Sequence, residues 1–219
     1  LRVVVHERLQ STISFLMKFF LKSVKIIAVS NHIKKNLTDQ GVKSSSIQTI
    51  YNGIKIGDTI KRKKQNIFKV IMLGNILEWK GQHIFIDSYK YLKSENVKYF
   101  IAGDIYDQKY FNSFSNKFDN NKINFLGFEI EIIKNLHKYD ILVHASQTPE
   151  PFGRTIIEAM SVGVPVIASD IGGPEEIITD MEDGLLFKRK SAKNLSSKIE
   201  LLINNHMSVS YTHLTLPTK

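Results

Sequence analysis

The chain of 219 residues contains no cysteine, five prolines and one tryptophan. The absence of cysteine excludes a disulfide framework and a thiolate metal site. No apolar run reaches the length of about 18 residues that a transmembrane helix requires. The first residue is Leu and no signal peptide is visible, so we expect the chain to be the inner part of a longer, cytoplasmic protein.

The charge is strongly basic and unevenly distributed. The formal net charge is +9, and residues 1–60, with nine Lys or Arg against three acids, carry +6 of it. A basic surface favours phosphates, anionic lipid head groups or nucleic acid as partners. The basic residues are scattered and lack interleaved aromatics, so we do not expect nucleic acid.

Strand and helix patterns alternate along the chain, which predicts an α/β protein with a parallel, doubly wound sheet. No Gly-x-Gly-x-x-Gly follows a first strand, which disfavours a dinucleotide dehydrogenase. Strands are expected over residues 3–7, 25–29, 47–51, 68–73, 98–102, 123–126, 139–144, 164–168 and 185–187. Helices are expected over residues 9–23, 31–38, 82–92, 108–118, 129–137, 154–161 and 191–205, and a turn at Asn52–Gly53.

The pattern divides the chain into two domains and a tail. Residues 1–60 form the first domain, a polar linker with the basic run 61–64 follows, and residues 64–206 form the second. Residues 207–219 have no helical period and are interpreted as an unrelated tail. The helix over 9–23 is interpreted either as an ordinary domain helix or as a membrane-surface helix, which would give a peripheral membrane contact.

The stretch 146–158 is the strongest candidate for a site. It is a loop between a predicted strand and helix, and open α/β sheets bind ligands at the carboxyl ends of their strands. Gly153 allows close approach to the backbone, and the free N–H groups of the helix start can bind an anion. Glu158 can accept two hydrogen bonds from a diol such as a ribose, and Glu150 can meet a second hydroxyl-rich group. The alternative is that both glutamates are ordinary surface residues.

Two further loops suit a phosphate ligand. Gly74 follows a predicted strand, and Lys80 stands at the next helix start, where it would act as a point charge. The backbone N–H groups of Gly172 and Gly173 can face a ligand after the strand over 164–168. The alternative for Lys80 is an ordinary surface lysine, and the alternative for Gly172–Gly173 is a flexible turn.

A resemblance to a known family begins at Glu150-Pro151-Phe152-Gly153 and includes Glu158-Ala159-Met160, with seven residues between the two glutamates. It continues through Gly163-Val164-Pro165-Val166 to Gly172-Gly173-Pro174-Glu175-Glu176. This stretch resembles the donor-binding signature of the retaining GT-B glycosyltransferases of family four, also called group 1. The resemblance covers residues 24–204. It implies two Rossmann-like domains, with the C-terminal domain near complete and the N-terminal, acceptor-binding domain partial.

The resemblance implies transfer of a sugar from a nucleotide diphosphate sugar to an acceptor hydroxyl, with retention. Glu158 would hold the ribose and Glu150 the donor sugar beside the reacting carbon, with the Phe152 and Gly153 amides facing the sugar. Lys80, the helix-start amides and the Gly172–Gly173 backbone would supply positive charge at the leaving diphosphate. No Asp-x-Asp pair suits a divalent ion there, so we predict no metal and no cofactor.

Three further positions either depart from the family pattern or allow two interpretations. Asn75 stands where the family has an arginine on the donor diphosphate, which removes one charge. Phe128 is expected either to contact the nucleobase or to pack in the domain. His6 is expected either near the reacting sugar or in a structural role.

The family implies a carbohydrate or lipid-linked acceptor, at the inner face of the membrane, in cell-surface polysaccharide or glycolipid synthesis. Alternative functions are a non-catalytic nucleotide-sugar binding fragment, a GT-B nucleotide-sugar epimerase and a membrane-surface scaffold.

Overall fold

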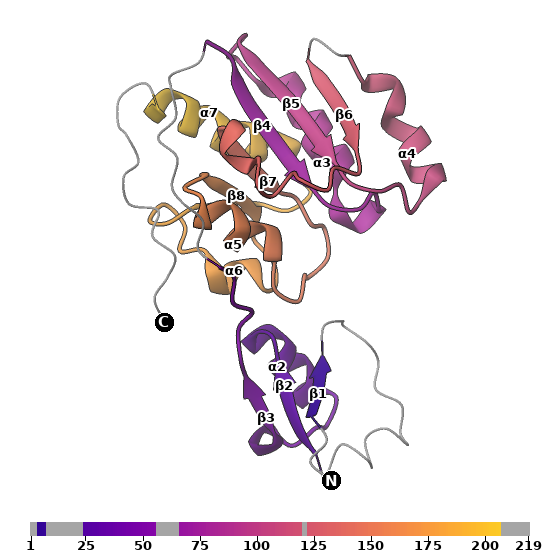
Figure 1. Cartoon of the computed structure of the whole chain (residues 1–219), viewed down its shortest axis with the longest axis vertical. Helices are drawn as coiled ribbons and strands as arrows, with labels where there is room; N and C mark the ends of the chain where they lie inside the picture. Colours follow the sequence, from indigo (N-terminus) through magenta and orange to yellow (C-terminus); the bar gives the residue numbers. More distant parts are fainter. Residues whose placement is uncertain (1–3, 8–23, 56–65, 120–121, 207–219) are drawn as a thin grey trace.

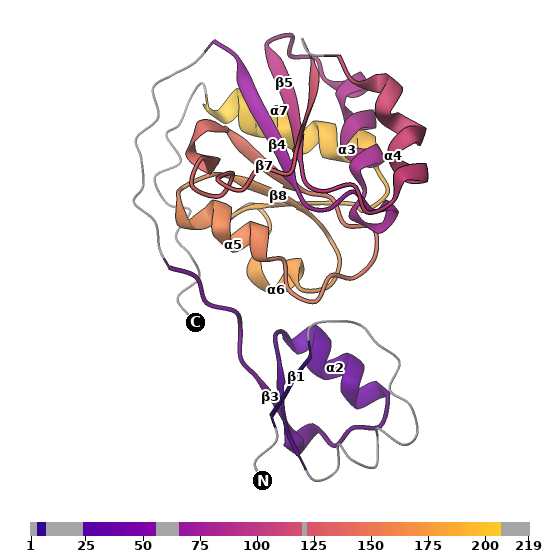
Figure 2. The ribbon, with the colours of Figure 1, turned by 45° about the vertical axis from the view of Figure 1, so that its right-hand side comes forward.

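The structure is a computed structural model that describes residues 4–7, 24–55, 66–119 and 122–206, and it contains two α/β units (Figure 1). The helix predicted over 9–23, the basic run 61–64 and the tail 207–219 lie outside the described residues. Figures 1 and 2 show the first unit below the second, and in Figure 1 the carboxyl ends of β4 (Phe68–Leu73) and β6 (Ile123–Gly127) are directed toward the first unit.

The first unit is a three-stranded parallel sheet of order β1-β2-β3 with one described α-helix and a short 3-10 helix. Ser30 caps that helix as predicted, because its Oγ accepts a hydrogen bond from the Ile33 amide at 3.1 Å. Ile33 and Leu37 bury its apolar face against Ile26 of the sheet. The elements are β1 (Val4–Glu7), β2 (Lys25–Ala28), α2 (Asn31–Asp39), η1 (Ser44–Ser46) and β3 (Ile47–Thr49).

The prediction of a turn at Asn52–Gly53 is wrong. Residues 51–55 form no turn and run toward the second unit. The Ile50 amide still bonds the Ala28 carbonyl at 2.9 Å, and the ring of Tyr51 then packs near that of Phe152. These contacts outweigh the local turn preference of an Asn-Gly pair.

The second unit is a six-stranded, all-parallel sheet of order β6-β5-β4-β7-β8-β9. This is a doubly wound sheet whose strand order reverses between β4 and β7, the position where such sheets bind ligands. The strands are β4 (Phe68–Leu73), β5 (Val97–Ala102), β6 (Ile123–Gly127), β7 (Ile141–His144), β8 (Val166–Ser169) and β9 (Leu185–Phe187). The helices are η2 (Glu78–Lys80), α3 (Gln82–Ser88), η3 (Tyr89–Tyr91), α4 (Gln108–Phe114), η4 (Ser115–Lys117), η5 (Leu136–Lys138), α5 (Arg154–Ser161), α6 (Pro174–Ile177) and α7 (Ala192–His206).

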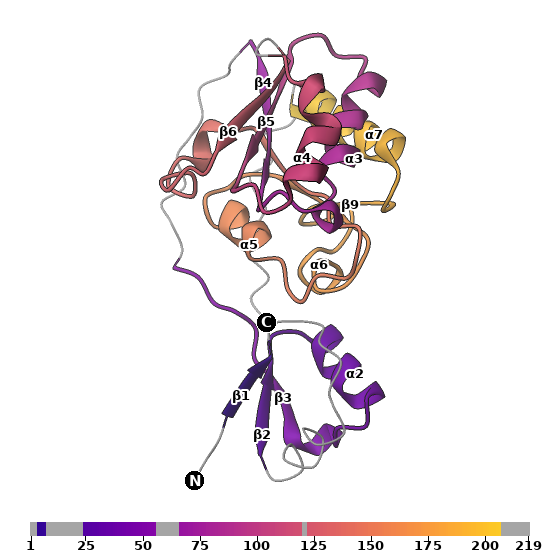
Figure 3. The same ribbon diagram turned by 90° about the vertical axis from the view of Figure 1, so that its right-hand side faces the viewer.

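Alternation along the strands divides the core between the two faces of this sheet. In β4, Val70 and Met72 pack under α3, α4 and α7, which Figure 3 shows on one side of the strands. Ile71 and Leu73 point to the other face, which α5 covers, and that apolar cluster continues into the first unit. Both faces are buried, as expected for a parallel sheet.

The prediction of a helix over 129–137 is also wrong. The segment forms turns and then η5, with i to i−3 bonds such as Ile132 N–H to the Glu129 carbonyl at 3.1 Å. Ile130 is 79% exposed and only Leu136 is fully buried. A short helix needs a continuous packed apolar face, and here only Leu136 and the partly buried Ile132 reach the core, while Ile130 and Ile133 are exposed.

Within the described ranges, no helix combines the length and the apolar character needed to span a bilayer.

Candidate functional site

The candidate site lies where the strand order reverses. β4 and β7 are hydrogen-bonded neighbours although about 70 residues separate them in the sequence. The loops that follow them therefore leave the same edge of the sheet side by side. They are joined directly, since the Gln147 amide bonds the Trp79 carbonyl at 2.6 Å. This contact brings the two sequence motifs with Lys80 and Glu150 into one site.

Glu150 is the centre of a compact polar cluster. The Nζ of Lys80 donates to both of its carboxylate oxygens at 2.9 Å, and the Oγ of Ser146 donates to Oε2 at 2.6 Å. The Nε2 of His144 lies 2.8 Å from Oε2, without the alignment of a hydrogen bond, so this is a close electrostatic contact. The Lys80 and Glu150 side chains are only 17% and 14% exposed.

The neighbours of Glu150 keep it ionised. Burial by itself would raise the pKa of the Glu150 carboxyl. The charge and contact of His144, then the charge of Lys80 and the hydroxyl of Ser146, outweigh burial and hold that pKa far below its ordinary value. The Lys80 ammonium also lies 4.3 Å from the centre of the Trp79 ring, a cation–π contact.

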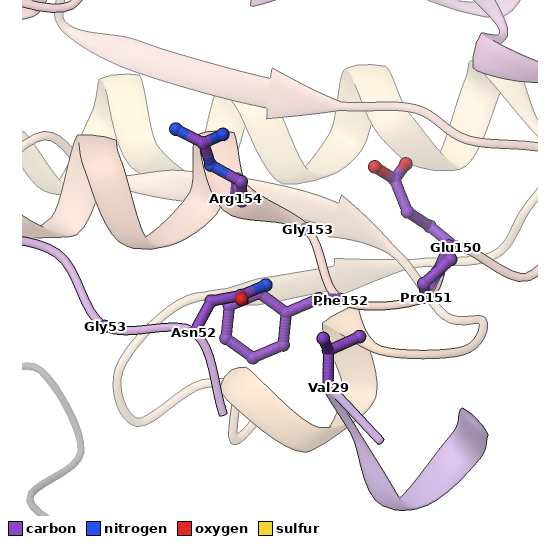
Figure 4. Close-up of a pocket in the computed structure, with 8 residues that line it drawn as sticks. All are labelled: Val29, Asn52, Gly53, Glu150, Pro151, Phe152, Gly153 and Arg154. Carbon is purple, nitrogen blue, oxygen red and sulfur yellow. The ribbon is translucent and has the colours of Figure 1, made fainter. Parts of the chain in front are cut away.

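A cleft of about 380 Å³ opens beside this cluster, between the two units. The second unit contributes residues 150–154, and the first contributes Val29, Asn52 and Gly53 (Figure 4). Phe152 is buried at the base of this wall. The cleft therefore has one wall from each unit.

The beginning of α5 presents free donors to the cleft. Gly153 has a φ of 102°, a left-handed conformation that a side chain would strain, and no side chain caps the helix. Among the described residues, no acceptor takes the amides of Phe152 and Gly153. A helix start with free N–H groups suits an anion or a ligand oxygen.

Glu158 lies on the second turn of α5. Its side chain is 12% exposed and pairs with the largely exposed guanidinium of Arg154 at 3.1 Å. Burial raises the pKa of the Glu158 carboxyl, and Arg154 only partly offsets it. Glu158 and Glu150 are therefore both partly buried and are not fully solvated surface residues.

The expectation that the amides of Gly172 and Gly173 face a ligand is wrong. The Gly172 amide donates to Glu175 Oε2 at 3.1 Å, and the Gly173 amide donates to the Glu150 carbonyl at 2.7 Å. A Cβ on Gly173 would lie 2.5 Å from the Phe152 Cα. These glycines let two loops pack backbone to backbone, and their amides are already used.

Three other predicted residues lie outside the cleft wall. Phe128, just past β6, is 65% exposed, which excludes a packing role. The Asn75 carbonyl accepts from the Gln82 side chain at 3.0 Å, and its own side chain makes no hydrogen bond within the described part. His6 stands opposite Ile27 in the β1–β2 register, and the structure describes only its strand position.

A second contact joins the units beside the cleft. The Glu176 carboxylate, on α6, accepts from the amides of Asn31 and His32 at the start of α2, the first at 2.8 Å. The Tyr51 hydroxyl donates to the same carboxylate at 3.1 Å. Burial, followed by this bond and the charge of Glu176, raises the pKa of Tyr51.

Sequence reasoning missed several of these residues. His144 and Ser146 had a usable signal, because His144 is a polar residue at the end of an apolar strand and Ser146 follows two residues later, shortly before Glu150. Val29, Asn52 and Glu176 had none, because only the contact between the units gives them a role. In the part of the chain that is described, no three His, Asp or Glu side chains gather as a metal site would require.

The fold is shared with solved structures of glycosyltransferases. The structure superposes on Anabaena HepE in complex with UDP-glucose with a TM-score of 0.82 and 26% identity, covering 94% of this chain and 64% of that one. A glycosyltransferase from Rickettsia africae superposes with a TM-score of 0.78 at 24% identity, covering 92% of this chain and 60% of that one. The architecture is that of the GT-B glycosyltransferases.

The chain belongs to the family glycosyl transferases group 1, whose model matches residues 57–212. It is 34% identical over 185 residues to an uncharacterized glycosyltransferase of Methanocaldococcus jannaschii, covering 84% of this chain and 50% of that protein. It is 32% identical over 146 residues to N,N'-diacetylbacillosaminyl-diphospho-undecaprenol alpha-1,3-N-acetylgalactosaminyltransferase of Campylobacter jejuni, covering 65% and 38%. The chain spans about half the length of the curated relatives it matches. The family resemblance seen in the sequence is confirmed.

Proposed function

We propose that this chain binds the donor in a retaining, metal-independent glycosyltransferase that moves a sugar from a nucleotide diphosphate sugar to an acceptor hydroxyl. The observation that carries the proposal is the buried Lys80–Glu150 pair at the reversal point of the sheet. It places a cation suited to a phosphate against a carboxylate that lines the cleft and is suited to a sugar hydroxyl. The similarity to HepE, whose structure holds UDP-glucose, supports a nucleotide sugar as the donor.

The chemical task is to stabilise the negative charge that grows on the leaving diphosphate. A cation and oriented N–H groups do this best in a site that excludes water. Lys80 would exchange its bond with Glu150 for one with the diphosphate, and the free amides of Phe152 and Gly153 would bind donor oxygens. The Gly172–Gly173 amides have no part in this step, because the protein already uses them.

The two glutamates would orient the donor. Glu150, released by Lys80, would accept from a hydroxyl of the sugar beside the reacting carbon. Glu158, on the adjacent helix, would accept both hydroxyls of the ribose. Asn75 would contribute a neutral contact where the resemblance implies a cation. Phe128, an exposed ring, is free to stack on the base.

We further propose a carbohydrate or lipid-linked acceptor, in the synthesis of a cell-surface polysaccharide or glycolipid. The Campylobacter relative is named for transfer to N,N'-diacetylbacillosaminyl-diphospho-undecaprenol. A capsular polysaccharide biosynthesis glycosyltransferase, CapM of Staphylococcus aureus, is 26% identical over 206 residues, covering 82% of this chain and 52% of that protein. The excess positive charge of residues 1–60 suits an anionic lipid surface.

Thermal unfolding with UDP, GDP or ADP tests the proposal. A ligand at about 100 times its dissociation constant stabilises the folded state by about 2.7 kcal/mol, which gives a readable rise in melting temperature. We expect a rise with one nucleotide, unchanged by EDTA and lost in Glu158→Ala. Glu182→Ala, which removes an exposed carboxylate elsewhere in the domain, is the matched control and retains the rise.

A cooperative melt that no nucleotide shifts would refute donor binding. A shift that needs a divalent ion would refute the metal-independent part. Product analysis with the nucleotide sugar but no acceptor separates transfer from epimerisation, since only an epimerase would release a new nucleotide sugar.

A further inference from the structure

The two carboxylate oxygens of Glu150 have unequal surroundings. Oε2 is contacted by three groups, Ser146 Oγ at 2.6 Å, His144 Nε2 at 2.8 Å and Lys80 Nζ at 2.9 Å. Oε1 has one partner among the described residues, Lys80 Nζ at 2.9 Å. Removing Lys80 would therefore leave Oε2 still held and Oε1 with no partner.

The groups on Oε2 belong to the rigid part of the site. His144 is the last residue of β7, in register with Ala168 of β8, and its side chain is 4% exposed. Ser146 follows two residues later and is also buried. The backbone of Glu150 is fixed as well, because its carbonyl accepts from the Gly173 amide at 2.7 Å. Lys80, by contrast, contacts the carboxylate through a long side chain that can adopt other rotamers.

The proposed function requires Lys80 to leave. Once its ammonium binds the diphosphate, Glu150 would be a buried carboxylate without its lysine, and an uncompensated buried charge is strongly unfavourable. A second polar partner must then hold the carboxylate in place. The misaligned His144 contact can tighten into a hydrogen bond at that stage, as catalytic contacts of empty sites often do.

Resting on the proposed function, we propose that His144 and Ser146 are positioning residues that hold Glu150 ionised and oriented through Oε2. Oε1, vacated by Lys80 when the donor binds, is then the oxygen that accepts from a hydroxyl of the sugar. The two residues act through Glu150 and touch neither the phosphate nor the base. Replacing either residue should therefore weaken binding of the nucleotide sugar and leave the affinity for the nucleotide alone unchanged.

Calorimetric titration of the full chain with UDP and with UDP-glucose measures the dissociation constants for the nucleotide and for the nucleotide sugar. If the melting series identifies guanine as the base, GDP and GDP-mannose replace them. The readout is the ratio of the two dissociation constants, because a change that weakens both affinities equally leaves this ratio unchanged. The variants are His144→Leu, which removes the ring nitrogens, His144→Gln, which restores an N–H near Nε2, and Ser146→Ala, which removes one hydroxyl.

We expect His144→Leu and Ser146→Ala to reduce the preference for the nucleotide sugar over the nucleotide by about tenfold, the effect of one lost charge-assisted hydrogen bond. Affinity for the nucleotide alone stays within about twofold, and His144→Gln recovers most of the preference. His137→Leu, a histidine change in η5 outside the site, keeps the parent ratio. Should His144→Leu fail to fold, as its melting curve would show, Ser146→Ala decides.

Two outcomes would overturn the inference. One is an unchanged ratio in Ser146→Ala and His144→Leu while the parent binds both ligands. The other is an equal loss for nucleotide and nucleotide sugar, which is what a purely structural role produces. Failure of the parent to bind either ligand would instead refute the proposed function, and this inference with it, so the two failures are distinguishable.

Discussion

Replacing Glu176 should loosen the contact between the two units. Its carboxylate accepts from two backbone amides at the start of α2 and from the Tyr51 hydroxyl. Helix α2 keeps its own cap, because Ser30 bonds the Ile33 amide independently. Glu176→Ala is therefore expected to leave both units folded and to weaken only the attachment between them.

The expected size follows from these contacts. An acidic group that caps a helix start contributes about 1 kcal/mol, and the helix dipole adds a few tenths. The contacts are partly exposed, so solvent screening limits their sum to about 1–2 kcal/mol. A change of that size shifts the ratio of closed to open arrangements by about 5- to 30-fold. Glu176→Gln retains an acceptor oxygen and should have a smaller effect.

The absence of cysteine makes the distance between the units directly measurable. Exposed Lys35 on α2 and Lys193 on α7 can be changed to cysteine and spin-labelled without competing thiols. Double electron–electron resonance should give one narrow distance in the parent and a broad, longer distribution in Glu176→Ala. Glu182→Ala removes the same charge from the same domain and should preserve the narrow distance.

The same distance distribution in the parent and in Glu176→Ala would refute the reasoning. It would mean that the apolar contacts around Tyr51 and Phe152 hold the units together alone. Broadening in Glu182→Ala as well would show that net charge, and not this carboxylate, is responsible.

Three further predictions concern the donor domain. Lys80→Met should weaken nucleotide diphosphate binding at least tenfold in calorimetry, because a charge-assisted bond is lost, and equal affinity would contradict the role of Lys80. The pKa of Glu158 in the folded state is raised above its ordinary value of 4.5, so the ionised carboxylate destabilises the fold at neutral pH. Glu158→Gln should therefore raise the free energy of urea unfolding at pH 7. This gain should vanish as the pH falls below about 4.5, where the carboxyl is protonated in the folded and unfolded states. A gain that is independent of pH would contradict this cause. Gly173→Ala forces a Cβ into the backbone of the neighbouring loop and should lower the free energy of unfolding by about 1–3 kcal/mol. The control Gly53→Ala places its Cβ in open space and should change that free energy little. Equal effects of the two variants would contradict the packing argument.

Local pattern was sufficient for much of this protein. Strand β4 (Phe68–Leu73) and helix α5 (Arg154–Ser161) were predicted at the bounds that the structure has. Buried parallel strands are continuous apolar runs, and the helix start is marked by its glycine, so both signals are contained in a few adjacent residues. The family could also be predicted from the sequence, because its signature is a contiguous stretch of chain.

Tertiary structure decided what no short stretch contains. The pairing of Lys80 with Glu150 depends on β4 and β7 becoming neighbours across about 70 residues of chain. The Gly173 amide is used by the Glu150 carbonyl, which only the folded loops bring to it, whereas the Gly172 amide bonds the carboxylate of Glu175 three residues later. The segment 129–137 has a helical pattern, but only Leu136 and part of Ile132 find the core, while Ile130 and Ile133 stay exposed. Sequence determined the elements and the residue types of the site, and packing decided which groups are paired, because burial and hydrogen bonding depend on neighbours that are distant along the chain.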